Sequence, residues 1–162
     1  MNVENFTDLY MRTVSDRRII GILLSGHLAI EYLLRQLIKS YDPALIKLSK
    51  DLTFARLISL NLDIGTINLK QYEVLYRINK IRNKFAHEIT YEVAVDELIE
   101  LFKLASGAFT DMTDGISQGL DALEKCTNIC ELEDYALAEL CVQIAYDLHE
   151  EYQARGGDIE EF

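Results

Sequence analysis

The sequence predicts an all-helical protein, and three observations support that fold class. Leu, Ile, Glu, Ala and Lys dominate the 162 residues, which suits long helices better than a sheet. Pro43 is the only proline and there are eight glycines, so helix-breaking residues are rare. Apolar residues recur at helical spacing, and no strand-like alternation persists. An antiparallel bundle of four or more helices is the natural way to bury these stripes.

The N-terminal third predicts a short helix followed by a long one. The segment from Asn5 to Val14 has apolar residues near helical spacing. Ser15 is a fair N-cap for the next helix, and Asp16 would complement its positive end. This helix should run to about Ser40. Its apolar belt is wider than one stripe, so we expect it to be central and to touch neighbours on more than one side.

Shorter elements should follow. Asp42-Pro43 interrupts the chain, and Pro43 fits the first position of a helix that continues through Lys47. Thr53 can cap a further helix over residues 54–60, which the turn near Gly65 ends. These elements should pack beside the long helix.

The middle of the chain predicts two more helices. Asn68 can cap a helix that ends near His87-Glu88. Its apolar stripe consists of Leu75, Ile78, Ile81 and Phe85. Thr90 or Tyr91 then begins a helix that carries apolar residues as far as Leu104.

The last part of the chain should be helical with one interruption. The stretch from Ser106 to Ser117 contains two glycines and is expected to loosen or break the helical run. A long helix is expected from about Leu132 to Tyr152. We therefore predict one domain over residues 1–155, with a core at about 15–105, added helices at about 116–153, and a frayed acidic tail at 156–162.

Charge is divided unevenly along the chain. The net charge is −11, yet from Arg12 to His87 there are 13 Lys and Arg against 6 Asp and Glu, a net of +7. From Glu88 to Phe162 there are 3 against 19, a net of −16. The basic half could gather an anionic ligand, because local fields guide approach. The acidic part could shield that surface, repel nucleic acid or keep the protein in solution.

Cysteine usage and hydropathy indicate a cytoplasmic protein. The three cysteines lie late in the chain, and Cys126 and Cys130 could form a loose metal pair. No second Cys or His pair completes a zinc site, so we expect no metal or other cofactor. We expect Cys126, Cys130 and Cys141 to be buried or semi-buried thiols in a reducing compartment. We see no signal peptide and no apolar run near the ~20 residues that span a bilayer. No membrane partner is therefore expected.

The strongest candidate for a catalytic or binding segment is Arg82-Asn83-Lys84-Phe85-Ala86-His87. Residues 76–87 contain four Lys and Arg and no carboxylate, which is also typical of an ordinary solvated helix face. Arg82 presents a rigid fork of donors suited to phosphate oxygens. His87 has a side chain able to transfer protons near neutral pH. The two would converge best if His87 lies where its helix ends, because five residues turn a helix by about 140°.

This segment resembles the Arg-x4-to-6-His motif of HEPN domains, including the frequent polar residue after the arginine. The order of helices over residues 17–102 is also similar to MltR-like and related HEPN-like bacterial families. The last sixty residues lie outside the resemblance. The resemblance implies a helical domain that dimerises with the two motifs facing each other across the interface.

Catalytic members of that family are metal-independent endoribonucleases. Our first hypothesis is that this chain is such a ribonuclease and is the toxin or effector of a toxin–antitoxin or phage-defence system. The resemblance implies that the RNA 2′-hydroxyl attacks the adjacent phosphate. His87 would act as general acid or base, and Arg82 would stabilise charge on the phosphorane. Asn83 would orient a phosphate oxygen or its neighbouring side chains, and Lys84 would support the site. RNA and a cognate antitoxin or other protein are then the expected partners.

His27 and Glu31 form a second candidate group. They stand four residues apart on the long helix and therefore share a face. They could support the site or ligate a metal, but a buried, hydrogen-bonded pair is the simpler interpretation. We expect Glu31 to contact Arg82, because a semi-buried carboxylate requires a cationic or donor partner.

Non-catalytic functions are open alternatives. His87 could cap its helix, and Arg82 could pair with Glu31 or Glu88, so that the motif would be structural. The chain would then be a regulator similar to MltR-like repressors, or a helical protein-interaction module with an acidic docking surface. A helical subunit that completes a partner's enzyme is a third hypothesis.

Overall fold

The computed structural model describes residues 5–14 and 18–157, and within these ranges every regular element is helical. The predicted all-α fold class is confirmed. The elements are α1 Phe6–Val14, α2 Arg18–Tyr41, η1 Pro43–Leu45, α3 Ile46–Ser49, α4 Phe54–Asp63, α5 Leu69–His87, α6 Val95–Ser106, α7 Gly115–Lys125, η2 Ile129–Glu131 and α8 Asp134–Ala154.

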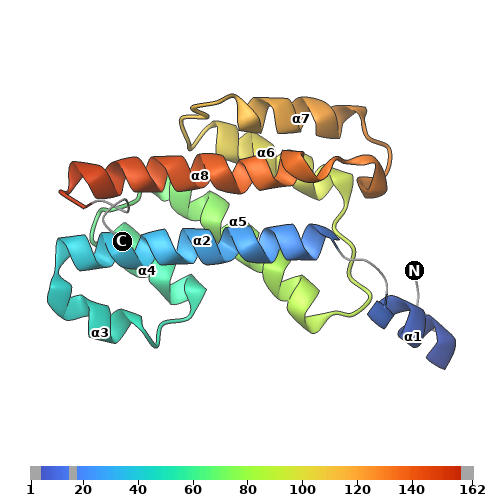
Figure 1. Cartoon of the computed structure of the whole chain (residues 1–162), viewed down its shortest axis with the longest axis horizontal. Coiled ribbons are helices and arrows are strands. Elements are labelled where there is room, and N and C mark those ends of the chain that lie inside the picture. The colour runs from blue at the N-terminus through green and yellow to red at the C-terminus, as the bar shows by residue number, and fades with distance from the viewer. Residues whose placement is uncertain (1–4, 15–17, 158–162) are drawn as a thin grey trace.

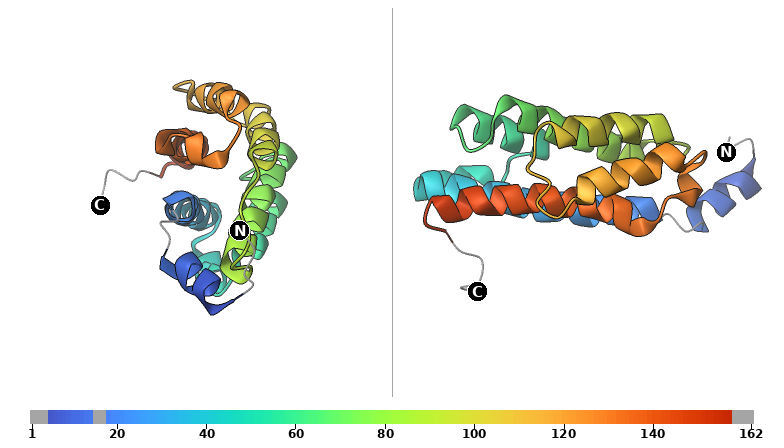
Figure 2. Two further views of the ribbon diagram at one scale, coloured as in Figure 1. Left: turned by 90° about the vertical axis from the view of Figure 1, so that its right-hand side faces the viewer. Right: turned by 90° about the horizontal axis from the view of Figure 1, so that it is seen from above.

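The helices pack around a common core in two layers (Figures 1 and 2). Helices α2 and α8 lie side by side in one layer, and α4, α5 and α6 form the other. Helix α7 packs between α6 and α8 and joins the layers on one side. On the other side α2 contacts both α4 and α5, so the core is enclosed from both sides.

Helix α2 is central, as its wide apolar belt predicts. It packs against α8, α4 and α5. Its buried side chains are Leu23, His27, Ile30, Leu33, Leu34, Leu37 and Ile38. These side chains fall on one broad face of the helix, and their burial is the main favourable term that holds α2 in place. Leu24, Leu28 and Tyr32, which widen the apolar belt in the sequence, are exposed.

Helices α2 and α8 run in the same direction although they are far apart in sequence. Arg18 in the first turn of α2 pairs with Asp134 in the first turn of α8, with Nη1 and Oδ2 3.2 Å apart. Figure 1 shows the two helices extending together from that end. The start of α2 also lies beside the end of α5, because Leu24 and Phe85 line one depression. The Arg82-to-His87 segment and the start of α2 thus share one end of the molecule.

Helix boundaries follow the sequence signals with local exceptions. Thr53 stands at the N-cap of α4 but makes no side-chain capping hydrogen bond, and α4 runs past the expected end at Leu60 to Asp63. Asp42 caps η1 by accepting a hydrogen bond from Ala44 N. Ser15 and Asp16, the predicted cap of α2, lie outside the described residues.

The predicted start of the sixth helix at Thr90 or Tyr91 is wrong. Helix α6 begins at Val95, and residues 91–94 are not helical. Two contacts hold this segment out of the helix: the Val93 side chain is buried in the core, and the Tyr91 hydroxyl donates to Glu97 Oε2 at 2.7 Å. Apolar periodicity continues through the segment, so tertiary contacts overrode the pattern.

The interruption expected between Ser106 and Ser117 separates α6 from α7. Asp111 organises this loop by accepting hydrogen bonds from Ile116 N at 2.6 Å and Ser117 N at 2.9 Å, at the start of α7. In the described parts of the chain, no helix combines the length and the hydropathy that crossing a bilayer requires.

Candidate functional site

The Arg82-to-His87 segment forms the C-terminal end of α5. Asn68 starts this helix with a capping box: its side chain accepts from Gln71 N at 3.1 Å, and Gln71 Oε1 accepts from Asn68 N at 3.0 Å. The rotation of the helix is fixed by buried side chains, which include Val74, Leu75, Ile78 and Ile81. His87 is the last helical residue, and the backbone of Glu88 is extended.

Arg82 lies half-buried beside the first turns of α2. Its Nη1 donates to Asn83 Oδ1 at 3.0 Å. It forms one wall of a depression of about 220 Å³ whose other walls are apolar, namely Ile20, Leu23, Leu24, Phe85 and Ala86. Among the residues that the structure describes, no carboxylate pairs with Arg82. Apolar walls strengthen the attraction between a guanidinium and an anion, because the local dielectric is low.

His27 is enclosed between α2, α4 and α5. Its side chain is 3% exposed, and its ring centroid lies 4.0 Å from that of Phe54. Nδ1 lies 3.9 Å from Glu31 Oε2, too far for a hydrogen bond, and neither ring nitrogen has a hydrogen-bond partner within the described chain. The expected hydrogen-bonded His27–Glu31 pair is therefore not formed.

Burial sets the protonation state of His27. Desolvation lowers the pKa of the imidazole, and the nearby positive charge of Arg82 lowers it further, while the Glu31 carboxylate opposes both effects. The ring is therefore neutral at pH 7.

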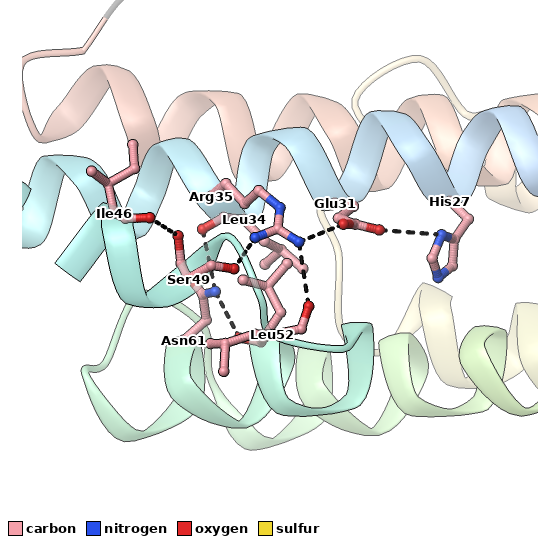
Figure 3. Close-up of polar contacts among 9 residues, drawn as sticks. His27, Glu31, Leu34, Arg35, Ile46, Ser49, Leu52 and Asn61 are labelled. Atoms are coloured by element: carbon pink, nitrogen blue, oxygen red, sulfur yellow. Dashed lines mark hydrogen bonds and ion pairs between the residues drawn. The ribbon is translucent and has the colours of Figure 1, made fainter.

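The predicted contact between Glu31 and Arg82 is wrong. Glu31 Oε1 instead accepts from Arg35 Nη2 at 2.6 Å, one turn further along α2 (Figure 3). Arg35 also donates to the backbone carbonyls of Ser49 and Leu52, which tie the loop after α3 to α2. An arginine four residues away on the same helix is always within reach, and its other donors fix its position here.

Lys84 faces away from Arg82 and belongs to a different cluster. Its Nζ pairs with Glu97 Oε1 at 3.1 Å and lies 4.9 Å from the centre of the Tyr91 ring. Phe85 meets the same ring edge-on at 4.8 Å. This cluster joins the end of α5 to the first turn of α6, so Lys84 has a structural role that the sequence did not indicate.

Glu97 is the ionised centre of that cluster. Its partial burial alone would raise the pKa of its carboxyl group, but hydrogen bonds from Tyr91 and Lys84, and the charges of Lys84 and Arg77, outweigh this effect and lower the pKa. Burial and the same hydrogen bond raise the pKa of the Tyr91 phenol. The sequence signal for this cluster was an acidic residue in the first turn of a helix.

His87 is exposed and lies on another face of α5 from Arg82. The helix stays regular through His87, so the step of five positions from Arg82 to His87 corresponds to about 140° of rotation. Within one chain, the structure thus brings Arg82 together with Asn83 and His27. It leaves His87, Lys84 and Glu31 on other surfaces or with other partners.

Metal ligands do not gather in the described part of the chain. There, no group of three or more His, Cys, Asp and Glu side chains is arranged to hold a metal ion. All three cysteines are free thiols, and Cys126 is half-buried and Cys141 buried, as expected. The expected burial is wrong for Cys130, which is exposed because it lies on the short η2 turn, where no residue is buried. Burial raises the pKa of the Cys141 thiol to about 12, so this thiol is protonated and unreactive near pH 7.

Comparisons with known proteins leave the candidate site to be interpreted from its own geometry. No protein family model, no curated protein sequence and no solved structure matches the chain.

Proposed function

We propose that this chain is a HEPN-like, metal-independent endoribonuclease that acts as a homodimer. The observation that carries the proposal is Arg82: a half-buried guanidinium beside Asn83, at the end of a helix that His87 terminates, with no carboxylate partner in the described chain. A cation that is held but not neutralised is what a phosphate site requires. Such an activity fits the effector of a toxin–antitoxin or phage-defence system.

The proposed reaction is transesterification within the RNA backbone. A 2′-hydroxyl loses its proton to a general base and attacks the adjacent phosphorus, and the bond to the 5′-oxygen breaks. The leaving oxygen takes a proton from a general acid, which leaves a 2′,3′-cyclic phosphate and a 5′-hydroxyl. His87 supplies one of these proton transfers, worth about 10²–10⁴-fold. Arg82 stabilises the charge that develops on the phosphorane, and Asn83 orients it.

The separation of Arg82 and His87 around α5 supports a dimer as the active form. One phosphate cannot easily contact both side chains of one chain when about 140° of rotation separates them. A two-fold axis between two motif ends would set Arg82 of one copy opposite His87 of the partner subunit. In that arrangement each dimer has two composite sites.

The charge along the second half of α5 also supports an anionic ligand at this end. Residues 76–87 contain four Lys and Arg and no carboxylate. Arg77 and Lys84 pair with Glu100 and Glu97 of α6, while Lys80 and Arg82 have no carboxylate partner among the described residues. A local excess of positive charge raises the concentration of a polyanion near the site in spite of the overall negative charge.

The test is cleavage of a pool of structured and single-stranded RNAs by purified protein in EDTA. Wild type should leave 2′,3′-cyclic phosphate ends, while Arg82→Ala and His87→Ala should lose at least 10²-fold in rate. Lys70→Ala, an exposed cation at the opposite end of α5, is the matched control and should keep full activity. Normal cleavage by His87→Ala protein would remove the basis of the proposal.

A regulatory or interaction function is the second candidate. This candidate is favoured by the effect of Arg82 on a buried residue: its positive charge lowers the pKa of His27. Arg82 can therefore contribute to the structure without contacting a ligand. In a non-catalytic, MltR-like regulator or helical interaction module, Arg82→Ala would change the stability or dimerisation of the protein. Stable, dimeric Arg82→Ala protein that has lost RNA cleavage would rule this candidate out.

A further inference from the structure

Helix α1 presents apolar side chains that the rest of the chain does not cover. Phe6 is 79% exposed, Tyr10 56% and Met11 51%. In Figure 1 the helix lies beyond the ends of the other helices, and it packs extensively on none of them within the described residues. A nine-residue helix is marginal in water on its own. We therefore expect the apolar face of α1 to pack against another surface.

Such a surface exists between α2 and α8. A groove of about 720 Å³ runs between the two helices, and none of its lining residues belongs to α5 or α6. Small or apolar side chains form its walls: Gly21, Ser25 and Ala29 from α2, and Ala138, Val142 and Ala145 from α8. Small residues keep the groove open along both helices, because no large side chain fills the space between them.

The groove and α1 match in length and character. The wall of the groove extends from Arg18 to Ala29 on α2, about 16 Å at 1.5 Å per residue, while the nine residues of α1 span about 13.5 Å. Arg18 and Asp134 pair at one end of the groove, and its length beyond them is uncharged. On α1, Phe6 and Tyr10 lie about 40° apart and form one uncharged stripe, whereas Met11 lies about 140° from Phe6 and outside that stripe.

A second copy of the chain is the occupant that these features favour. Three residues, 15–17, separate α1 from α2, and short connections favour exchange of an element between copies over folding back. Two copies that each carry a net charge of −11 repel, so they associate most readily through surfaces without charge. The apolar stripe of α1 and the groove are two such surfaces.

We propose that α1 of one copy docks in the α2–α8 groove of a second copy, and that the exchange is reciprocal. Phe6 and Tyr10, 79% and 56% exposed, would together bury on the order of 300 Å². With the matching groove surface, and with both copies counted, the total is on the order of 1,000 Å², the lower limit for a specific protein–protein interface. The inference goes beyond the ribonuclease proposal and does not depend on it.

Cross-linking between two different chains tests the exchange directly. In a background of Cys126→Ser, Cys130→Ser and Cys141→Ala, chosen because Cys141 also lines the groove, one chain carries Tyr10→Cys and the other carries Ser25→Cys. Mild oxidation of the mixture should give a disulfide-linked pair containing one chain of each kind, and neither variant alone should give it. A chain with both substitutions that forms the disulfide internally would overturn the proposal in favour of folding back. The absence of any cross-link would overturn it as well.

A charge placed on α1 gives an independent measurement. Phe6→Asp and Tyr10→Asp should raise the dissociation constant of the dimer at least tenfold, as measured by sedimentation or light scattering over a concentration series. Leu48→Asp on α3 is the matched control, because that side chain is 68% exposed and lies away from the groove; it should leave the constant unchanged. A dissociation constant that is the same for Phe6→Asp and wild type would contradict the docking of α1.

Discussion

Gly26 of α2 and Cys141 of α8 meet where the two helices pack against each other. A Cβ atom built on Gly26 would stand 2.6 Å from the Cys141 Cβ and closer still to its sulfur. Side-chain atoms do not approach one another this closely, so glycine is required here by packing and not by backbone conformation. The pair fixes how near α2 and α8 can lie.

Two glycines on α2 should therefore respond in opposite directions to the same substitution. Gly26→Ala overpacks the contact with Cys141 and should lower the free energy of unfolding by about 1–3 kcal/mol. Gly21→Ala, with nothing within 4 Å of the added atom, should raise it by roughly 0.5–1 kcal/mol through helix propensity. Urea denaturation at a concentration where the chain is monomeric measures both. Equal effects of the two substitutions would contradict the close packing.

His27 should make the stability of the fold depend on pH. Its pKa in the folded protein lies below the ordinary value of 6.5, so as the pH falls through 6.5 the unfolded chain binds more protons than the folded protein does. The free energy of unfolding should therefore keep its full value above about pH 6.5 and decrease as the pH falls below it. Arg82, which faces His27 from α5, adds to this effect, and Glu31 on α2 opposes it, while α4 contributes the uncharged Phe54.

Replacing His27 isolates that effect. His27→Leu cannot be protonated and should flatten the dependence of unfolding free energy on pH between about 5 and 6.5. His87→Leu removes an exposed imidazole and should leave the wild-type slope in place. Urea denaturation at a series of pH values provides the comparison. The same slope in His27→Leu as in wild type would show that another group is responsible.

Mixed dimers can show whether the proposed site is shared between copies. If Arg82 works with His87 of the partner subunit, Arg82→Ala and His87→Ala proteins are each inactive, but a mixed dimer contains one intact site. An equal mixture that exchanges freely should recover about one quarter of the wild-type RNA cleavage rate. No recovery, with exchange verified by differently tagged chains, would place each site within a single chain.

The hydroxyl of Tyr91 should stabilise the junction of α5 and α6. It donates to Glu97 Oε2 at 2.7 Å, so Tyr91→Phe should lower the free energy of unfolding by about 1 kcal/mol. Tyr76→Phe on α5 is the control: that tyrosine is exposed, its hydroxyl makes no hydrogen bond within the described chain, and the change should stay within about 0.5 kcal/mol. In a double-mutant cycle, Glu97→Gln should lessen the effect of Tyr91→Phe, and additive losses would argue against the contact.

Local sequence signals predicted local structure well in this chain. The apolar belt of α2 anticipated its central place, and the Asn68 cap anticipated where α5 begins, because each depends on residues within one or two turns. The start of α6 was missed, since burial of Val93 and the Tyr91–Glu97 hydrogen bond override the periodicity there. Such contacts depend on which residues meet in the folded protein, and local sequence periodicity does not specify this.

Partners of charged side chains were harder to predict than helices. From the sequence, more than one cation could reach Glu31. In the structure its partner is Arg35, because hydrogen bonds to the carbonyls of Ser49 and Leu52 hold the Arg35 guanidinium beside it. The nearness of Arg82 and His27 depends on how α5 crosses α2, which sequence spacing does not specify. The site could therefore be located on α5 from the sequence, but its surroundings could not.

The parallel pairing of α2 with α8 has a consequence for how the protein is made. Helix α2 ends at Tyr41, and its most extensive neighbour does not begin until Asp134. At a synthesis rate of about 5–20 residues per second, α8 is completed on the order of 5–20 s after α2. During that interval the nascent chain holds a long apolar helix with one side uncovered, a state in which ribosome-associated chaperones would have time to bind.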